Sequence, residues 1–101
     1  MLNYGYSGTQ QYAGNNPLAV GRAGIPVRIY SVELISGGSA STVKLFNGTD
    51  NTAGTQYGQV DGVASKSVVV NYEFGKRFPA GCYLGTDANT GYVSVSYSQE
   101  F

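Results

Sequence analysis

The chain's only cysteine, Cys82, lies in the run GKRFPAGCYLG (residues 75–85), which also contains two basic residues, Lys76 and Arg77. Nearby positive charge lowers the pKa of a thiol and favours the nucleophilic thiolate. Nucleophilic catalysis also needs an activating base, and the chain contains no histidine to serve as one. If a strand starts after Gly81, Cys82 and Leu84 share a face. The sequence therefore predicts that Cys82 is a small apolar residue of the core.

Other short motifs lack residues that their chemistry requires. The pair Gly75-Lys76 has neither the preceding glycine nor the following Ser or Thr of a phosphate loop. In residues 87–91 oxygens alternate as in a calcium loop, but Tyr92 and Ser98 replace the glycine and the glutamate. The six carboxylates are scattered, and one cysteine without histidine makes a poor zinc site. We expect no enzyme activity, no cofactor and no metal.

The composition limits the classes of partner. A chain of 101 residues is the size of one domain, and its six basic residues balance six acidic ones. This balance excludes the positive surface that nucleic-acid binding needs, and it weakens repulsion between copies. The sequence has neither the start of a signal peptide nor a run long enough to span a membrane. We expect synthesis in a cytoplasm, no membrane partner and no small-molecule substrate.

Period-2 alternation of apolar residues begins at Ile25. It predicts strands at 26–36, 41–48, 65–74 and 92–101, with weaker candidates at 55–60 and 82–84. Glycine, Asn-Gly and Asp-Gly turns separate these runs, and the longest loop, residues 47–56, has the composition of an exposed hairpin tip. The sequence predicts an all-β antiparallel β-sandwich, jelly-roll or Ig-like, with a small barrel as the alternative.

Aromatic residues are numerous, with nine tyrosines and four phenylalanines. Alternation places four of them on the predicted core face: Tyr30, Tyr72, Phe74 and Tyr97. We expect the aromatic side chains to pack inside the domain and at contacts between subunits, where tyrosine is enriched.

Residues 1–24 differ in composition from the rest of the chain. They contain five glycines, three tyrosines and one charged residue, and their apolar residues show no regular spacing. They predict an extended arm, and residues 25–101 predict the sandwich domain. An arm with so few aliphatic residues cannot order itself, so its apolar side chains would pack on another surface. A frayed terminus is the alternative.

The runs GIPVRIYSVELISGG, STVKLFNGTD and GKRFPAGCYLGTDANTGYVSVSYSQEF resemble small virion proteins of tailed bacteriophages. In that family a β-sandwich ends with an FPAGCY corner, a DAN turn and a final alternating strand. The resemblance covers Gly24 to Phe101 and implies a non-enzymatic structural protein, most like a capsid decoration (cement) protein. It also implies a location on the capsid exterior, made in the bacterial host cytoplasm. The implied partners are the major capsid protein and copies of the chain itself, as a symmetric oligomer, often a trimer.

A neutral sandwich with an arm can bind a repeating lattice through strand-like backbone and buried tyrosines, and symmetry multiplies each weak contact. The expected partner-binding residues are Tyr4, Tyr6, Tyr12, Leu18, Arg22, Lys76 and Arg77. Two other functions stay open. One is a head-tail connector, neck or fibre-anchoring protein of the virion. The other is a carbohydrate- or receptor-binding module that uses exposed tyrosines and residues 47–56.

Overall fold

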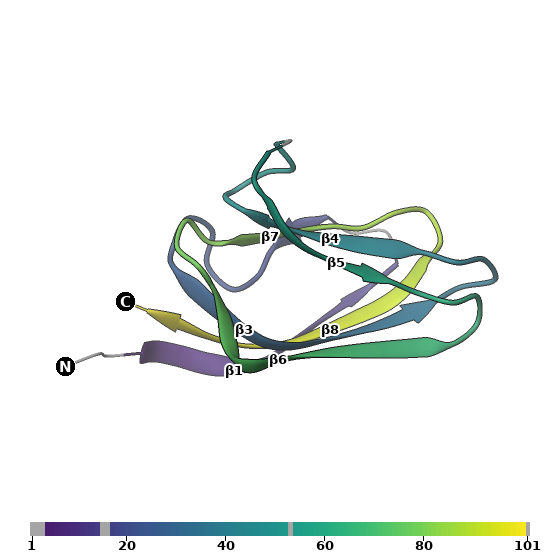
Figure 1. Ribbon diagram of the computed structural model, residues 1–101, viewed down its shortest axis with the longest axis horizontal. Helices are drawn as coiled ribbons and strands as arrows, with labels where there is room; N and C mark the ends of the chain where they lie inside the picture. The colour runs from purple at the N-terminus through teal and green to yellow at the C-terminus, as the bar shows by residue number, and fades with distance from the viewer. Residues whose placement is uncertain (1–3, 15–16, 53, 101) are drawn as a thin grey trace.

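The computed structural model describes residues 4–14, 17–52 and 54–100, with side chains at 11–14, 17–52 and 54–99. The described residues form eight strands and no helix, so they include none that is long and apolar enough to cross a membrane. The strands are β1 (Tyr4–Ala13), β2 (Leu18–Ala19), β3 (Val27–Ser36), β4 (Thr42–Asn47), β5 (Gln56–Asp61), β6 (Ser67–Phe78), β7 (Cys82–Gly85) and β8 (Thr90–Glu100). They build two layered sheets (Figure 1). The predicted all-β sandwich is confirmed.

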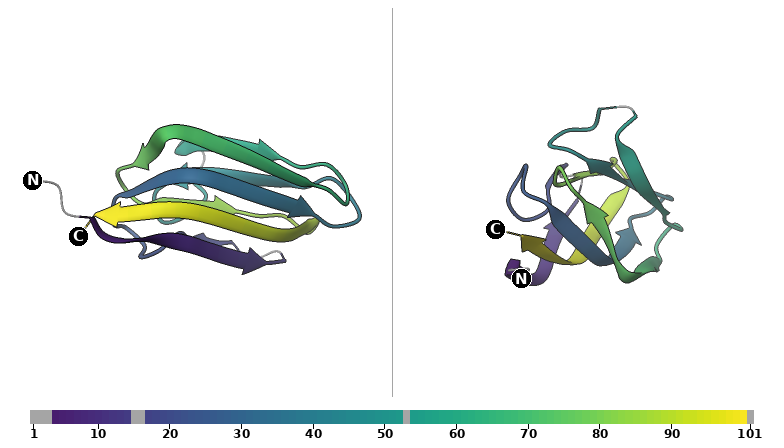
Figure 2. Two further views of the ribbon diagram at one scale, coloured as in Figure 1. Left: turned by 90° about the horizontal axis from the view of Figure 1, so that it is seen from below. Right: turned by 60° about the vertical axis from the view of Figure 1, so that its left-hand side comes forward.

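The strands pair in a nested order. β1 pairs with β8, β2 with β7, β3 with β6 and β4 with β5, always antiparallel. The resulting sheets have the orders β1-β8-β3-β6 and β2-β7-β4-β5, and Figure 2 shows the first of them face on. Nested pairing of eight strands in two sheets is the jelly-roll arrangement, whereas the Ig-like alternative divides its strands differently.

The core lies between the two sheets and consists mainly of aliphatic side chains on alternate positions. Its fully buried members include Val32 and Leu34 on β3, Leu45 on β4 and Val95 on β8. Burial of each such side chain stabilises the fold by roughly 1.5–3 kcal/mol. Cys82 belongs to the same cluster, with 2% of its surface exposed. The prediction that this thiol points into the core is confirmed.

Part of the predicted N-terminal arm lies within the sandwich. Residues 4–13 form β1 along the edge of β8, and the ring of Tyr12 and the side chain of Val20 are buried in the core. The boundary predicted at residue 24 therefore does not separate an arm from the sandwich in this structure. The strand needs little apolar content of its own, because β8 supplies its backbone partners and a surface for Tyr12.

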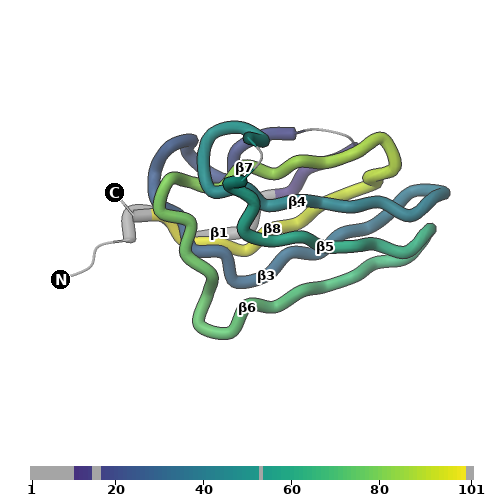
Figure 3. The backbone as a smooth tube through the Cα atoms, turned by 45° about the horizontal axis from the view of Figure 1, so that its top comes forward, coloured from purple at the N-terminus to yellow at the C-terminus, as the bar shows by residue number. Residues whose placement is uncertain are grey.

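Strict alternation assigned two aromatic residues to the wrong face. The register shifts between Ile29 and Ser31, whose partners on β6 are Lys76 and Asn71. Two steps along β3 therefore match five steps along β6, and residues 72–75 loop out of the ladder. Phe74 lies in this loop and is exposed. Tyr30 is exposed because the same two steps along β3 match only one step along β8, so Tyr30 is the extra residue of a bulge. Figure 3 shows β6 following the sheet edge and then bending sharply.

Candidate docking site at strand β6

Residues 72–75, here called the Phe74 turn, hold an aromatic ring in solvent. Phe74 is 86% exposed, and its backbone has a positive φ of 64°. A left-handed backbone costs a residue with a side chain roughly 1–2 kcal/mol, and for a bulky residue it is an outlier. Burial of the ring does not offset this cost. Folding alone therefore does not explain an aromatic residue at this position.

The turn is supported from β3. The guanidinium Nη1 of Arg28 donates a hydrogen bond to the carbonyl oxygen of Phe74, at 3.3 Å. Gly75 follows with φ of 79°, and a Cβ there would lie 2.4 Å from Cγ of Arg28 and 2.9 Å from Cε1 of Tyr30. The hydroxyl oxygen of Tyr30 lies 2.9 Å from Oγ of Ser98, which fixes the ring beneath the turn. The turn is thus held in place, although its tip faces solvent.

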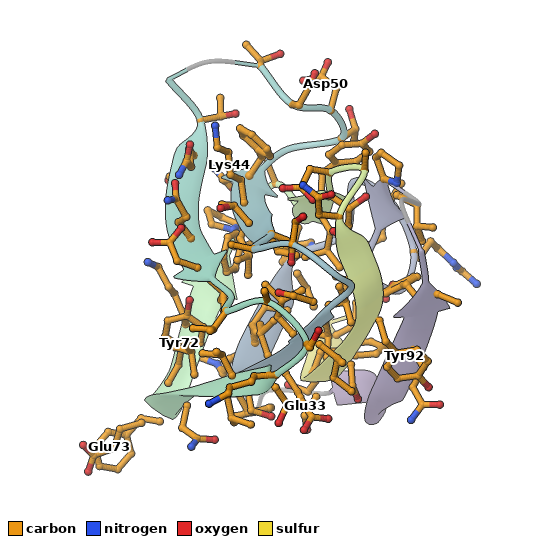
Figure 4. All side chains as sticks on the ribbon, turned by 90° about the vertical axis from the view of Figure 1, so that its right-hand side faces the viewer. Glu33, Lys44, Asp50, Tyr72, Glu73 and Tyr92 are labelled. Atoms are coloured by element: carbon orange, nitrogen blue, oxygen red, sulfur yellow. The ribbon has the colours of Figure 1, made fainter. Side chains whose placement is uncertain are left out.

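The exposed large apolar side chains belong to the β5–β6 side of the molecule and to its neighbouring strand β3. All the large apolar side chains that stand exposed in the described part of the chain lie on β3, β5, β6 or the β5–β6 loop: Tyr30, Ile35, Tyr57, Val63, Val69 and Phe74. Isolated exposed apolar residues are common, so the position that stands out is Phe74, whose exposed fraction of 86% is well above that of the next residue, Val63, at 54%. In Figure 4, Glu73 marks the outermost point of this side and Tyr72 lies closer to the body.

Basic residues flank the Phe74 turn. Nζ of Lys76 donates to the carbonyl oxygen of Tyr57 and lies 5.5 Å from the ring centroid of Tyr72. The ammonium group of Lys76 therefore joins β6 to β5 and also adds positive charge beside the Phe74 turn. Arg77 is exposed and faces Arg28 across the β3–β6 pair. Of the predicted partner-binding residues, these two lie beside the candidate site.

Four of the other predicted partner-binding residues, Tyr4, Tyr6, Tyr12 and Leu18, belong to β1 or β2, the edge strands opposite β6 and β5. The hydroxyl of Tyr12 donates to the carbonyl oxygen of Ala19 at 3.2 Å, and burial raises the Tyr12 pKa well above its ordinary value, helped by Tyr97 and Cys82. Leu18 is half-buried against the core. These side chains bind within the protein, in contrast to the predicted contact with a partner. The side chains of Tyr4 and Tyr6 lie outside the described residues.

Arg22 is tied to the C-terminal strand through its backbone. Its N–H donates to Oε1 of Gln99 at 3.0 Å, and its carbonyl accepts from Nε2 of Gln99 at 2.7 Å. Nε2 also reaches the carbonyl of Ile25, at 3.3 Å. With 1% of its surface exposed, Gln99 clamps this segment, a role that the sequence did not indicate.

Phe74, Arg28 and Tyr30 did not figure in the predicted site. The signal that points to them is Gly75, which directly follows the strand predicted at 65–74 and lies within the observed β6, because glycine in a strand often marks a bulge. Cys82 is not part of any exposed site. Burial raises the pKa of its thiol to about 12, so it stays protonated at neutral pH.

A hollow lies on the outer face of the sheet β2-β7-β4-β5. It is an open groove of about 690 Å³, and most of its lining residues carry hydrogen-bonding side chains. Nε2 of Gln56 donates to Oε1 of Gln59 at 3.0 Å, and Nε2 of Gln59 donates to Oδ1 of Asp61 at 2.8 Å. Lys44 also lines the groove and lies below the loop that was predicted at residues 47–56, as Figure 4 shows.

Comparisons with known proteins give the fold a distant neighbour. No protein-family model and no curated protein matches the chain. A solved structure described as a Bacillus endospore appendage, from a family of disulfide-linked pili, aligns over 100% of this chain and 96% of its own, with a TM-score of 0.47 and 11% identity.

Proposed function

We propose that this protein is a non-enzymatic structural component of a phage virion, a decoration protein that binds the outer capsid shell as a symmetric oligomer. In this role the Phe74 turn enters an apolar pocket of the major capsid protein. The basic rim of Arg28, Lys76 and Arg77 then faces carboxylates around that pocket. Symmetry multiplies a contact of modest affinity.

The observation that carries the proposal is the exposed ring of Phe74 in a strained, supported backbone. Aromatic residues at the centre of a protein interface contribute most of the binding free energy, and a rigid support reduces the entropy lost on binding. Jelly rolls also serve as viral capsid domains and as lectins, so the fold is compatible with two classes of function. Phe74 favours docking to protein, because its ring is presented outward on a convex turn.

The test uses virions of the phage that encodes the chain. Quantitative mass spectrometry of purified particles should find on the order of hundreds of copies, as expected from shell symmetry, whereas about six or twelve copies indicate a connector or neck protein. Phe74→Ala should abolish retention on the shell while the protein stays folded. Val63→Ala, an exposed apolar residue on the same side but outside the turn, is the matched control and should be retained. Equal retention of both variants would contradict the docking role of Phe74.

The groove favours a second candidate function, which is saccharide binding. Planar amides and an ammonium group, arranged along a strand, match the paired hydroxyls of a sugar. Glycan-array binding by the wild type that is lost in Lys44→Ala and Gln59→Ala, but kept in Phe74→Ala, would favour this function. An array without binding would exclude it.

A further inference from the structure

The sheet β1-β8-β3-β6 has two edges, and they differ in their protection against pairing with another strand. Natural proteins protect sheet edges with charged residues, prolines, bulges or very short strands. At one edge, β6 carries Glu73, Lys76 and Arg77 together with the bulge at the Phe74 turn. This edge has two kinds of protection.

The other edge, β1, has none of these devices along most of its length. Residues 4–13 (YGYSGTQQYA) include no charged residue and no proline. The register with β8 shifts only between Tyr4 and Tyr6 and is then continuous from Tyr6 to Ala13. Because β1 is the end strand of its sheet, the outward N–H and C=O groups of this regular stretch face away from β8.

The remaining edges of the sandwich fit β1 poorly. β2 has two residues, and β5 ends in a charged residue, Asp61, while its Tyr57 carbonyl already accepts from Lys76. A second β1 is the most suitable partner within this protein, since it is equally long and uncharged. The chain carries no net charge, so two copies meet with little electrostatic repulsion.

We propose that two copies of the chain pair through β1, antiparallel about a two-fold axis, and form one continuous eight-stranded sheet. Such an isologous contact is self-complementary and satisfies the outward backbone groups of both strands. It leaves the Phe74 turn free at the far edge of each copy. The contact does not depend on the function proposed above, since it forms in the isolated protein.

The experiment measures the mass of the full-length protein by light scattering over a range of concentrations. The expected mass is twice the chain mass of 10.6 kDa, falling toward one chain on dilution. A double variant, Thr9→Lys with Gln11→Lys, adds charge to the β1 edge and should raise the dissociation constant at least tenfold. The matched control, Ser67→Lys with Asn71→Lys, adds the same charge to the β6 edge and should leave the dimer intact.

A cysteine scan provides a second measurement in case the lysine variant folds poorly. Single cysteines placed in turn at positions 7–11, with Cys82 replaced by serine, should form covalent dimers most efficiently near the two-fold axis. The same scan at positions 67–71 of β6 should give few covalent dimers. A monomer at all concentrations, a trimer, or cross-linking that peaks on β6 would overturn the proposal.

Discussion

The two sides of the sandwich are closed by different kinds of interaction. On the β1–β2 side, the Tyr12 hydroxyl and the Gln99 amide bind backbone groups, and every described large apolar side chain is at least half-buried. On the β5–β6 side, the ring centroids of Tyr57 and Phe78 lie 5.5 Å apart, and apolar side chains remain exposed. The first side thus uses its polar groups within the fold, whereas the second leaves apolar surface exposed.

The two sides differ in how much their polar and exposed side chains contribute to stability. The β1–β2 side holds buried polar groups that must find partners within the chain, because an unpaired buried group is costly. The β5–β6 side holds a strained, exposed residue that contributes nothing visible to the core. Substitutions on the two sides should therefore change different properties.

The largest effect is expected for Phe78→Ala. This ring is fully buried at the end of β6, so its truncation should lower the free energy of unfolding by about 3–5 kcal/mol. Urea denaturation measures the loss. Tyr57→Ala, which removes the exposed partner ring, should cost much less. Equal losses would mean that the β5–β6 side depends on its surface aromatic residues for stability.

Gln99→Ala should have the next largest effect. It removes a fully buried side chain and leaves the backbone N–H and C=O of Arg22 without their side-chain partner, at an expected cost of about 2–4 kcal/mol. Ser96→Ala, a half-buried position on the same strand, should change stability by less than about 0.5 kcal/mol. A near-neutral Gln99 variant would show that the clamp on the β1–β2 side is dispensable.

Cys82→Ser should cost about 1–3 kcal/mol at neutral pH, because a hydroxyl replaces a buried thiol. The cost should shrink at alkaline pH. Burial raises the folded-state pKa of the thiol to about 12, so the wild type is fully stabilised below the unfolded-state pKa and loses stability as pH rises from there toward 12. The slope is at most about 1.4 kcal/mol per pH unit for this group. Urea denaturation of both proteins from pH 7 to 10.5 measures it, and a difference independent of pH would contradict the buried thiol.

Alternation and turn composition sufficed to predict the sandwich and the position of Cys82, because both follow from local patterns. β1 escaped prediction because its stability comes from β8, some eighty residues away, and not from its own apolar residues. The exposure of Tyr30 depends on a bulge in β3, where two steps match one step along β8, and the exposure of Phe74 depends on the loop that leaves the β3–β6 ladder. Gly75 was the local sign of that loop. The clamp by Gln99 joins residues far apart in the chain and has no local sign.

The smallest expected effect on stability, and the most informative, belongs to Phe74→Gly. Glycine adopts a positive φ without steric cost, but it also gives the unfolded chain more freedom. Relief of strain should prevail and raise the free energy of unfolding by about 0.5–1 kcal/mol, while the proposed binding to the shell is lost.

Ser65→Gly is the matched control, since Ser65 is the other described residue with a side chain and a positive φ, 58°. The Ser65→Gly variant should have an unchanged or higher free energy of unfolding, and it should still bind the shell. If Phe74→Gly destabilised the protein, the ring would serve the fold, and the contrast between the two sides would no longer hold.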